Sequence, residues 1–138
     1  MIVLDTNVLS EPLKADADAA VLSWIGAQDD IATTAVTVAE LLTGARRLSP
    51  GRRRDHLLVG IERLLAAFPA SVLPYDESAA RRYAELQELR RSAGVPLSVE
   101  DGMIAATCSS RSLALATRNT KDFVGLGIRL VDPWELRA

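Results

Sequence analysis

Met1-Ile2-Val3-Leu4-Asp5-Thr6-Asn7 opens the chain and decides the fold that we expect. A run of apolar residues that ends at once in polar ones is typical of a short strand buried on both faces. A carboxylate that leaves such a strand is costly unless it is paired, hydrogen bonded or bound to a metal ion. Asp5 is therefore either the N-cap of a following helix or part of a functional site, and both interpretations stay open.

Beyond this opening, short β-like runs alternate with longer helical ones. Apolar spacing and Pro or Gly breaks predict helices over residues 17–27, 37–47, 52–68, 77–92 and 98–110. Strands are predicted over residues 1–4, 31–34, 71–73, 113–117 and 128–131, with a polar loop over 118–123 and a turn over 133–136. Strands separated by helices indicate βαβ units, so we predict an α/β fold with a mostly parallel sheet covered on both faces. We find no repeat or linker and predict one domain over residues 1–138.

Composition excludes several classes of protein. At 138 residues and 49% hydrophobic residues, the chain is expected to form a packed domain of ordinary size. One cysteine, Cys108, excludes an internal disulfide, and with the single histidine, His56, it cannot supply a zinc site of the usual kind. No apolar run approaches the roughly 20 residues of a membrane span, and the start lacks the features of a signal peptide. We expect a cytoplasmic protein with no membrane partner.

The charge balance bears on nucleic-acid binding. Sixteen basic and eighteen acidic residues give a net charge of −2, which argues against a protein that coats nucleic acid but not against an enzyme that handles it briefly. Fourteen of the basic residues are Arg, which suits bidentate contacts with phosphate. Five of them cluster at Arg46, Arg47, Arg52, Arg53 and Arg54. This cluster is either a solvated corner between two helices or a phosphate-binding patch.

Polar side chains follow two of the predicted strands. Asp5-Thr6-Asn7 comes after the first strand and Thr117-Arg118-Asn119 after the fourth. In open parallel sheets, sites form beyond the carboxyl ends of the strands, where the strand order reverses. This placement is the first indication of a functional site.

Two further acids stand at predicted helix starts. Glu40 ends Thr37-Val38-Ala39-Glu40 and Asp101 ends Ser98-Val99-Glu100-Asp101, both with the spacing of a capping box. We expect both acids in the first turn of a helix, with Asp101 turned inward and Glu100 more exposed to solvent. Each is either a capping residue or a ligand.

Carboxylates without an accompanying His or Cys favour a particular chemistry. Mg²⁺ and Mn²⁺ prefer oxygen ligands, and Mg²⁺ takes one or two carboxylates while keeping several waters. Such an ion can acidify an attacking water and neutralise charge on a phosphodiester, and a second ion can stabilise the leaving oxygen. The sequence therefore predicts a metal-dependent hydrolase acting on a polyanion, centred on Asp5, Glu40 and Asp101.

Five segments together resemble a known family. They are the opening heptapeptide, Thr37-Val38-Ala39-Glu40-Leu41, Glu100-Asp101-Gly102-Met103-Ile104-Ala105-Ala106-Thr107, Ala116-Thr117-Arg118-Asn119-Thr120-Lys121-Asp122-Phe123 and Asp132-Pro133-Trp134. In order and spacing they are similar to those of PIN domains, and in particular of VapC and FitB-type toxins. The resemblance covers nearly the whole chain. It implies a three-layer α/β/α sandwich with a five-stranded sheet, and a Mg²⁺- or Mn²⁺-dependent endoribonuclease.

The resemblance also implies roles for individual residues. Asp5, Glu40 and Asp101 match the family's acids as catalytic residues and metal ligands. The residues expected around them in the pocket are Thr6, Asn7, Thr117, Asn119 and Asp122, and possible RNA contacts are Arg46, Arg47 and Arg118. Many members place a fourth acid where Asn119 stands here, and Asp122 is the next acid in that loop. We therefore expect one well-bound ion, with any second ion arriving with the substrate.

Partners follow from the same resemblance. It implies a cognate antitoxin that holds the toxin inactive, a homodimer, and contact with DNA only through the antitoxin. The helices over 37–47 and 52–68 either form the antitoxin groove or bury an ordinary core face. An alternative is a non-catalytic relative that binds RNA or protein, which Asn119 keeps open. A phosphatase with Asp5 as covalent nucleophile is weakened by Asn7, where that class has a second acid.

Overall fold

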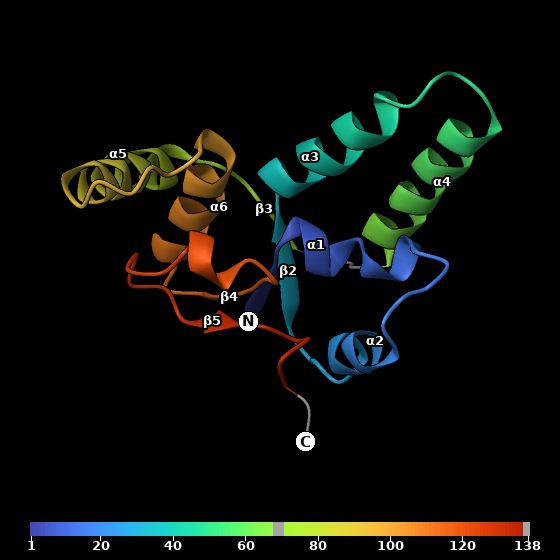
Figure 1. Ribbon diagram of the computed structural model, residues 1–138, viewed down its shortest axis with the longest axis horizontal. Coiled ribbons are helices and arrows are strands. Elements are labelled where there is room, and N and C mark those ends of the chain that lie inside the picture. The colour runs from blue at the N-terminus through green and yellow to red at the C-terminus, as the bar shows by residue number, and fades with distance from the viewer. Residues whose placement is uncertain (68–70, 137–138) are drawn as a thin grey trace.

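The computed structural model describes residues 1–67 and 71–136. Its strands are β1 (Ile2–Leu4), β2 (Ile31–Thr34), β3 (Val72–Leu73), β4 (Ala114–Ala116) and β5 (Leu130–Val131). Its α-helices are α1 (Thr6–Leu9), α2 (Ala19–Gly26), α3 (Ala35–Arg46), α4 (Arg52–Ala66), α5 (Glu77–Ser92) and α6 (Val99–Ser109), joined by 3₁₀ helices at Glu11–Leu13 and Thr120–Asp122 (Figure 1). Phe68, the last residue of the helix predicted over 52–68, lies outside the described residues. No helix in the described ranges has the length and apolar character that crossing a bilayer requires.

The sheet has the order β3-β2-β1-β4-β5, and every strand pairing in it is parallel. The α/β/α sandwich with five parallel strands that the sequence predicts is confirmed. Connections from β1 lead first to β2 on one side and later to β4 on the other, so the strand order reverses at β1. The carboxyl ends of β1 and β4 therefore flank the point where sites form in such sheets.

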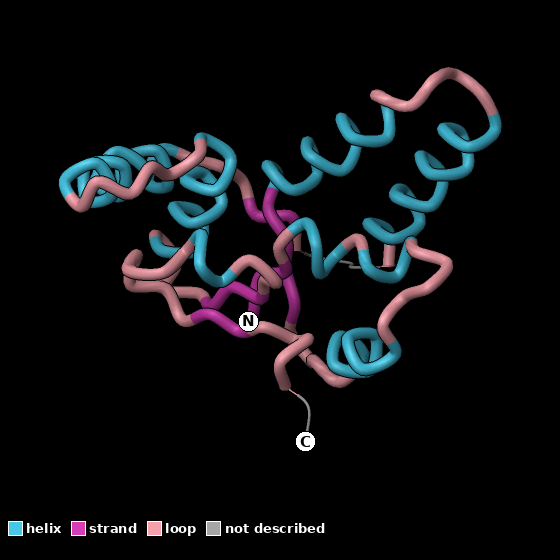
Figure 2. The backbone as a smooth tube through the Cα atoms, in the orientation of Figure 1, coloured by secondary structure: helices cyan, strands magenta, loops and turns pink. Residues whose placement is uncertain are grey.

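Two hydrophobic cores lie on opposite faces of the sheet. Val3 faces the core under α5 and α6, whereas Ile2 and Leu4 face the core under α1, α2 and α4, as the alternation of a strand requires. The helices lie on both sides of the magenta strands in Figure 2. Burial on both faces explains why β1 is a continuous apolar run.

The register of β1 against β4 pairs Leu4 with Ala116 on one face of the sheet and Val3 with Leu115 on the other. All four residues are at most 1% exposed. This close packing fixes the two strand ends that carry the polar side chains.

Helix α3 begins two residues earlier than the sequence predicts. Thr34 is its N-cap, and the Thr34 hydroxyl accepts a hydrogen bond from the Thr37 N–H at 3.0 Å. The predicted capping box at Thr37 is wrong because the chain turns into the helix directly at the end of β2. Glu40 consequently lies in the second turn of α3 and not in the first. Asp101 lies in the first turn of α6 as predicted, where its N–H donates to the Ser98 hydroxyl at 3.2 Å.

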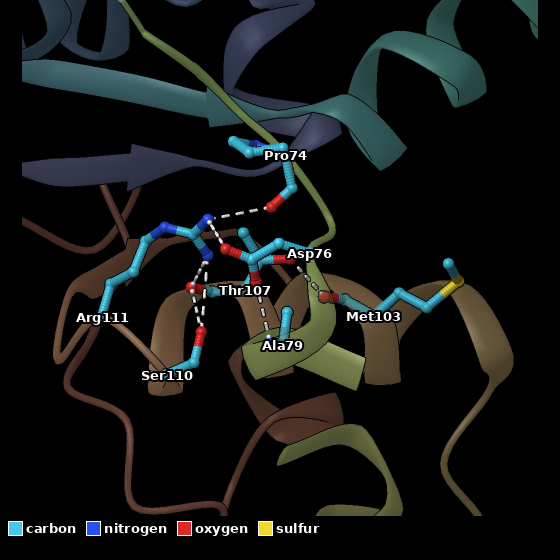
Figure 3. Close-up of polar contacts among 7 residues, drawn as sticks. All are labelled: Pro74, Asp76, Ala79, Met103, Thr107, Ser110 and Arg111. Carbon is cyan, nitrogen blue, oxygen red and sulfur yellow. Dashed lines mark hydrogen bonds and ion pairs between the residues drawn. The ribbon is translucent and has the colours of Figure 1, made fainter. Parts of the chain in front are cut away.

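Arg111 joins the end of α6 to the start of α5. Its guanidinium donates to the carbonyls of Thr107 and Pro74, each at 3.0 Å, and pairs with Asp76 at 3.2 Å (Figure 3). Asp76 in turn caps α5 by accepting from the Ala79 N–H at 3.0 Å. The helix that carries Asp101 is therefore held at its far end.

A second arginine holds the loop that follows β4. Arg90 of α5 is only 6% exposed, and its guanidinium donates to the carbonyls of Asp122 at 2.7 Å and Val124 at 3.0 Å. Burying a guanidinium is costly without such partners. The pairing fixes the backbone on which Asp122 stands.

Replacing this buried side chain tests its structural role. Arg90→Met should lower the free energy of unfolding by about 2–3 kcal/mol, because two charge-assisted hydrogen bonds of a buried guanidinium are lost. Arg91→Met, at the exposed neighbouring position, is the matched control and should change stability by less than about 0.5 kcal/mol. Equal losses in denaturant unfolding of both variants would contradict the role given to Arg90.

Candidate active site

Asp5 occupies the end of β1 next to the end of β4. The Asp5 N–H donates to the Ala116 carbonyl at 2.9 Å, and the side chain is 5% exposed. Its Oδ1 accepts from the Thr6 N–H at 2.8 Å and its Oδ2 accepts from the Thr117 hydroxyl at 2.7 Å. Asp5 is thus the N-cap of α1, and it also faces the side chains that follow β4. The two interpretations left open by the sequence are compatible.

Thr117 is the centre of a small hydrogen-bond network. Its buried hydroxyl donates to Asp5, accepts from the Asn119 N–H at 3.1 Å and receives a longer contact from Asn7 Nδ2 at 3.5 Å. Asn7 Oδ1 accepts from the Arg118 N–H at 3.1 Å. The structure therefore brings together the two polar segments predicted to share a site. Asn119 contributes its backbone N–H to this network.

Thr6 connects the same site to α3. Its hydroxyl donates to Glu40 Oε1 at 2.8 Å. Glu40 and Thr6 are both half-buried. A single hydroxyl thus sets the orientation of a carboxylate that lies 34 positions away in the sequence.

Burial and mutual repulsion raise the pKa values of the central acids. The pKa of Asp5 lies above its ordinary value chiefly because of burial, although hydrogen bonds from Thr117 and Thr6 lower it and the charge of Asp122 raises it further. Burial likewise raises the pKa of Asp101, with the charges of Asp5, Asp122 and Glu100 adding to it and a hydrogen bond with Ser98 opposing it.

Glu40 belongs to the same electrostatic group. Its pKa is raised first by burial and then by the charges of Asp5, Asp101 and Glu100, while the hydrogen bond from Thr6 lowers it. Five acids therefore act on one another, and we call them the carboxylate cluster: Asp5, Glu40, Glu100, Asp101 and Asp122. No cation of the described residues forms an ion pair with any of these five acids.

The donor chemistry of the cluster is that of a hard cation site. Its side chains offer only oxygen, the ligand that Mg²⁺ and Mn²⁺ prefer. Cys108 is buried with a pKa raised to about 12, so it is a neutral thiol and not a ligand or nucleophile. Within residues 1–67 and 71–136, no three Asp, Glu, His or Cys side chains converge as a ready-made ligand set.

A groove opens beside two members of the cluster. Its volume is about 650 Å³, and Glu40, Glu100, Arg47, Tyr75 and Met103 are among the residues that line it. Glu40 and Arg47 lie seven positions apart and so on the same face of α3. Arg46 points elsewhere, into a separate hollow between α3 and α4. The two arginines that the sequence grouped together therefore serve different surfaces.

The structure adds two residues that the sequence did not assign to the site. Glu100 was expected only to be solvent-facing; it is exposed, yet its charge acts on Glu40 and Asp101. Tyr75 lines the groove although nothing in its sequence context indicated this. The charge of Asp122, which was expected in the pocket, acts on both Asp5 and Asp101. The first acid after β4 is thus three positions beyond Asn119.

Comparison with known proteins identifies the family. The family model described as PIN domain matches residues 2–126. The chain belongs to the PIN domain family. A VapC ribonuclease of Sinorhizobium fredii is 42% identical over 138 residues, covering 98% of this chain and 99% of that protein.

Two solved structures contain chains with the same fold. The crystal structure of FitAcB from Neisseria gonorrhoeae contains a chain that is 37% identical, with a TM-score of 0.91, covering 99% of this chain and all of that one. VapBC-5 from Mycobacterium tuberculosis, described as a member of a family of toxin–antitoxin systems, contains a chain 30% identical with a TM-score of 0.72, covering 94% of this chain and 95% of that one. The resemblance on which the sequence prediction rested is confirmed.

The raised pKa values predict how stability depends on pH. The pKa of Asp101 in the folded protein lies above its ordinary value of 3.8. The stability that its carboxyl group contributes is therefore fully present below pH 3.8 and is lost as the pH rises through the folded pKa. Asp101→Asn mimics the neutral form. The metal-free variant should therefore match the unaltered protein at acidic pH and melt higher near neutral pH, by about 2 °C after allowance for partial exposure.

Thermal unfolding in EDTA across this pH range is the measurement. Asp29→Asn, at an exposed position before β2, is the control for the loss of an acidic charge outside the cluster. If the Tm difference between Asp101→Asn and the unaltered protein shrinks toward neutral pH, the charged Asp101 carboxylate does not destabilise the metal-free fold.

Proposed function

We propose that this PIN domain is a metal-dependent endoribonuclease and the toxin of a toxin–antitoxin pair. The observation that carries the proposal is the carboxylate cluster around Asp5 at the point where the strand order reverses. Its charges repel one another and would repel a polyanion, so a bound divalent cation is the natural means to stabilise them. The 42% identity to a VapC ribonuclease supports RNA as the substrate.

Asp5, Glu40 and Asp101 are the proposed ligands of Mg²⁺ or Mn²⁺. Bound there, the cation would acidify a water and neutralise charge on the scissile phosphate. Asp5 is already oriented by Thr6 and Thr117, and Glu40 by Thr6, so these side chains need little reorganisation to bind. Asp101 stands in the first turn of α6, and Glu100 beside it faces the groove.

Metal binding is coupled to loss of protons from these groups. Each of the three acids has a raised pKa, and the carboxylate form is the ligand, so binding releases protons. Affinity for the cation should therefore fall as pH is lowered through the raised pKa values. The unpaired charge that costs stability in the metal-free protein is what supplies affinity for the ion.

Substrate would reach the cluster along the groove beside α3. Arg47 stands at one part of this groove and Glu40 at another, so a phosphate of the RNA can contact the guanidinium while a neighbouring one meets the carboxylates. Arg118 lies exposed beside the other end of the cluster. These are the RNA contacts we propose, with Arg46 assigned to another surface.

An antitoxin is the proposed protein partner. VapBC-5, whose toxin-like chain shares this fold, belongs to a family of toxin–antitoxin systems. A hollow of about 320 Å³ lined by Leu13, Leu57 and Glu40, among others, runs from the α3–α4 hairpin to the carboxylate cluster. An antitoxin segment lying there would approach Glu40 directly. We also propose that the toxin is a homodimer and that DNA is contacted only through the antitoxin.

Cleavage of RNA is the direct test. Purified protein, freed of antitoxin, should cut a labelled total-RNA pool with Mg²⁺ or Mn²⁺ and should not cut it in EDTA. Asp5→Asn and Asp101→Asn should each lower the rate at least about 100-fold, since even loss of an orienting partner costs about 10- to 100-fold. Asp29→Asn is the control for acidic charge in general. Folded protein that binds the cation but cuts no RNA would instead favour a non-catalytic RNA- or protein-binding role.

Asp122 gives a second, graded test. Its charge reaches Asp5 and Asp101, but Asp122 is only half-buried in the 3₁₀ helix Thr120–Asp122, whereas Asp5 is buried. Asp122→Asn should therefore raise the metal concentration needed for half-maximal cleavage about 10-fold while retaining activity at saturating metal. The metal titration of Asn119→Asp, which adds an acid in the same loop, provides the comparison. An unchanged metal requirement in Asp122→Asn would remove it from the site.

A further inference from the structure

We infer that Trp134 positions Arg118 to bind an RNA phosphate next to the carboxylate cluster. The guanidinium carbon of Arg118 lies 4.8 Å from the centroid of the Trp134 ring, a cation–π contact. Arg118 comes from the segment after β4, and Trp134 from the segment after β5. The inference rests on the proposed function, whose substrate it locates more closely.

Trp134 is a fixed platform. Its ring is half-buried and packs against the core under α1, α2 and α4. The backbone N–H of Trp134 donates to Asp132 Oδ1 at 2.9 Å, which orders the turn that carries the ring. A side chain stacked on such a surface has few alternative positions, although Arg118 itself is exposed.

The backbone of Arg118 is linked to the site by a chain of polar contacts. Its N–H donates to Asn7 Oδ1, Asn7 contacts the Thr117 hydroxyl, and that hydroxyl donates to Asp5. These contacts tie the backbone of Arg118 to the carboxylate that we propose as a metal ligand. Residues held in this way from both ends suit the recognition of a substrate group adjacent to the reacting one.

The charge of Arg118 remains available to a ligand. Among the described residues no carboxylate lies within ion-pair distance of it, although five acids stand close to the same edge of the sheet. A flexible arginine beside such a cluster would be expected to pair with it. Stacking on Trp134 instead keeps the cation outside the cluster, where a phosphate of the substrate can meet it.

Binding of RNA, measured apart from cleavage, tests the inference. All variants carry Asp101→Asn, which lies outside the Arg118–Asn7–Thr117 chain and should prevent cleavage in Mg²⁺. Affinity for a short, fluorescently labelled single-stranded RNA is measured by anisotropy over a range of salt concentrations. Arg118→Gln should weaken binding about 10-fold. It should also reduce the salt dependence by about 0.7 in the slope of log K against log salt, the value for one phosphate contact.

Trp134 is tested by its coupling to Arg118. Trp134→Leu should weaken binding about 3- to 10-fold, and Trp134→Phe less, because an indole ring binds a cation best. Added to Arg118→Gln, Trp134→Leu should cost less than about 2-fold more, since there is no guanidinium left to position. If Trp134→Leu fails to fold, Trp134→Phe provides the same comparison in both backgrounds.

The outcomes separate this inference from the proposed function. Arg129→Gln is the matched control for charge. Arg129 is exposed and directly precedes β5, so it lies at the amino end of that strand, away from the carboxyl ends that carry the cluster. The variant should change affinity by less than about 2-fold. Equal effects of Trp134→Leu with and without Arg118, or unchanged affinity in Arg118→Gln, would overturn the inference even if the unaltered protein cuts RNA. RNA binding with the expected coupling but no cleavage by the unaltered protein would support the inference and refute the nuclease.

Discussion

The hydrogen bond between Thr117 and the buried carboxylate of Asp5 is the contact on which the site depends. It joins the carboxyl ends of the two strands at which the sheet order reverses, and it is made by a hydroxyl that also accepts from Asn119. A buried carboxylate of raised pKa requires such donors, and the strand pairing of Leu4 with Ala116 brings them within reach. The packing of two hydrophobic cores therefore sets the geometry of a polar site.

The remaining acids are attached to this centre by elements that pack elsewhere. Glu40 is reached from β1 through the Thr6 hydroxyl, and Asp101 is held by α6, whose far end is fixed by Arg111. Asp122 stands on a loop whose carbonyl is bound by the buried Arg90. Two arginines thus stabilise a cluster of acids through backbone and capping contacts, without neutralising the acids themselves. That arrangement leaves the negative charge for a cation.

The same principle applies to the positive charge at the edge of the site. An ion pair between Arg118 and one of the acids would neutralise both charges, and neither would then be available to a ligand. The aromatic face of Trp134 offers an alternative partner that does not neutralise the guanidinium. Separated charges of opposite sign, each held by neutral or remote groups, are what binding a metal ion and a phosphate side by side requires.

The sequence by itself determined the layered α/β fold and the burial of β1, because apolar periodicity is a local signal. It also singled out Asp5, Glu40 and Asp101 as candidate site acids. Asp5 could also be assigned from the cost of a charge at the end of a buried strand. The start of α3 was misplaced, since Thr34 and Thr37 are both good caps and only the end of β2 selects between them. Glu100, Tyr75 and the stacking of Arg118 on Trp134 were beyond the sequence, because each depends on segments that meet only when the sheet is assembled. Which acids share one electrostatic field was likewise decided by tertiary structure, since repulsion and burial depend on distances that the order of residues does not contain.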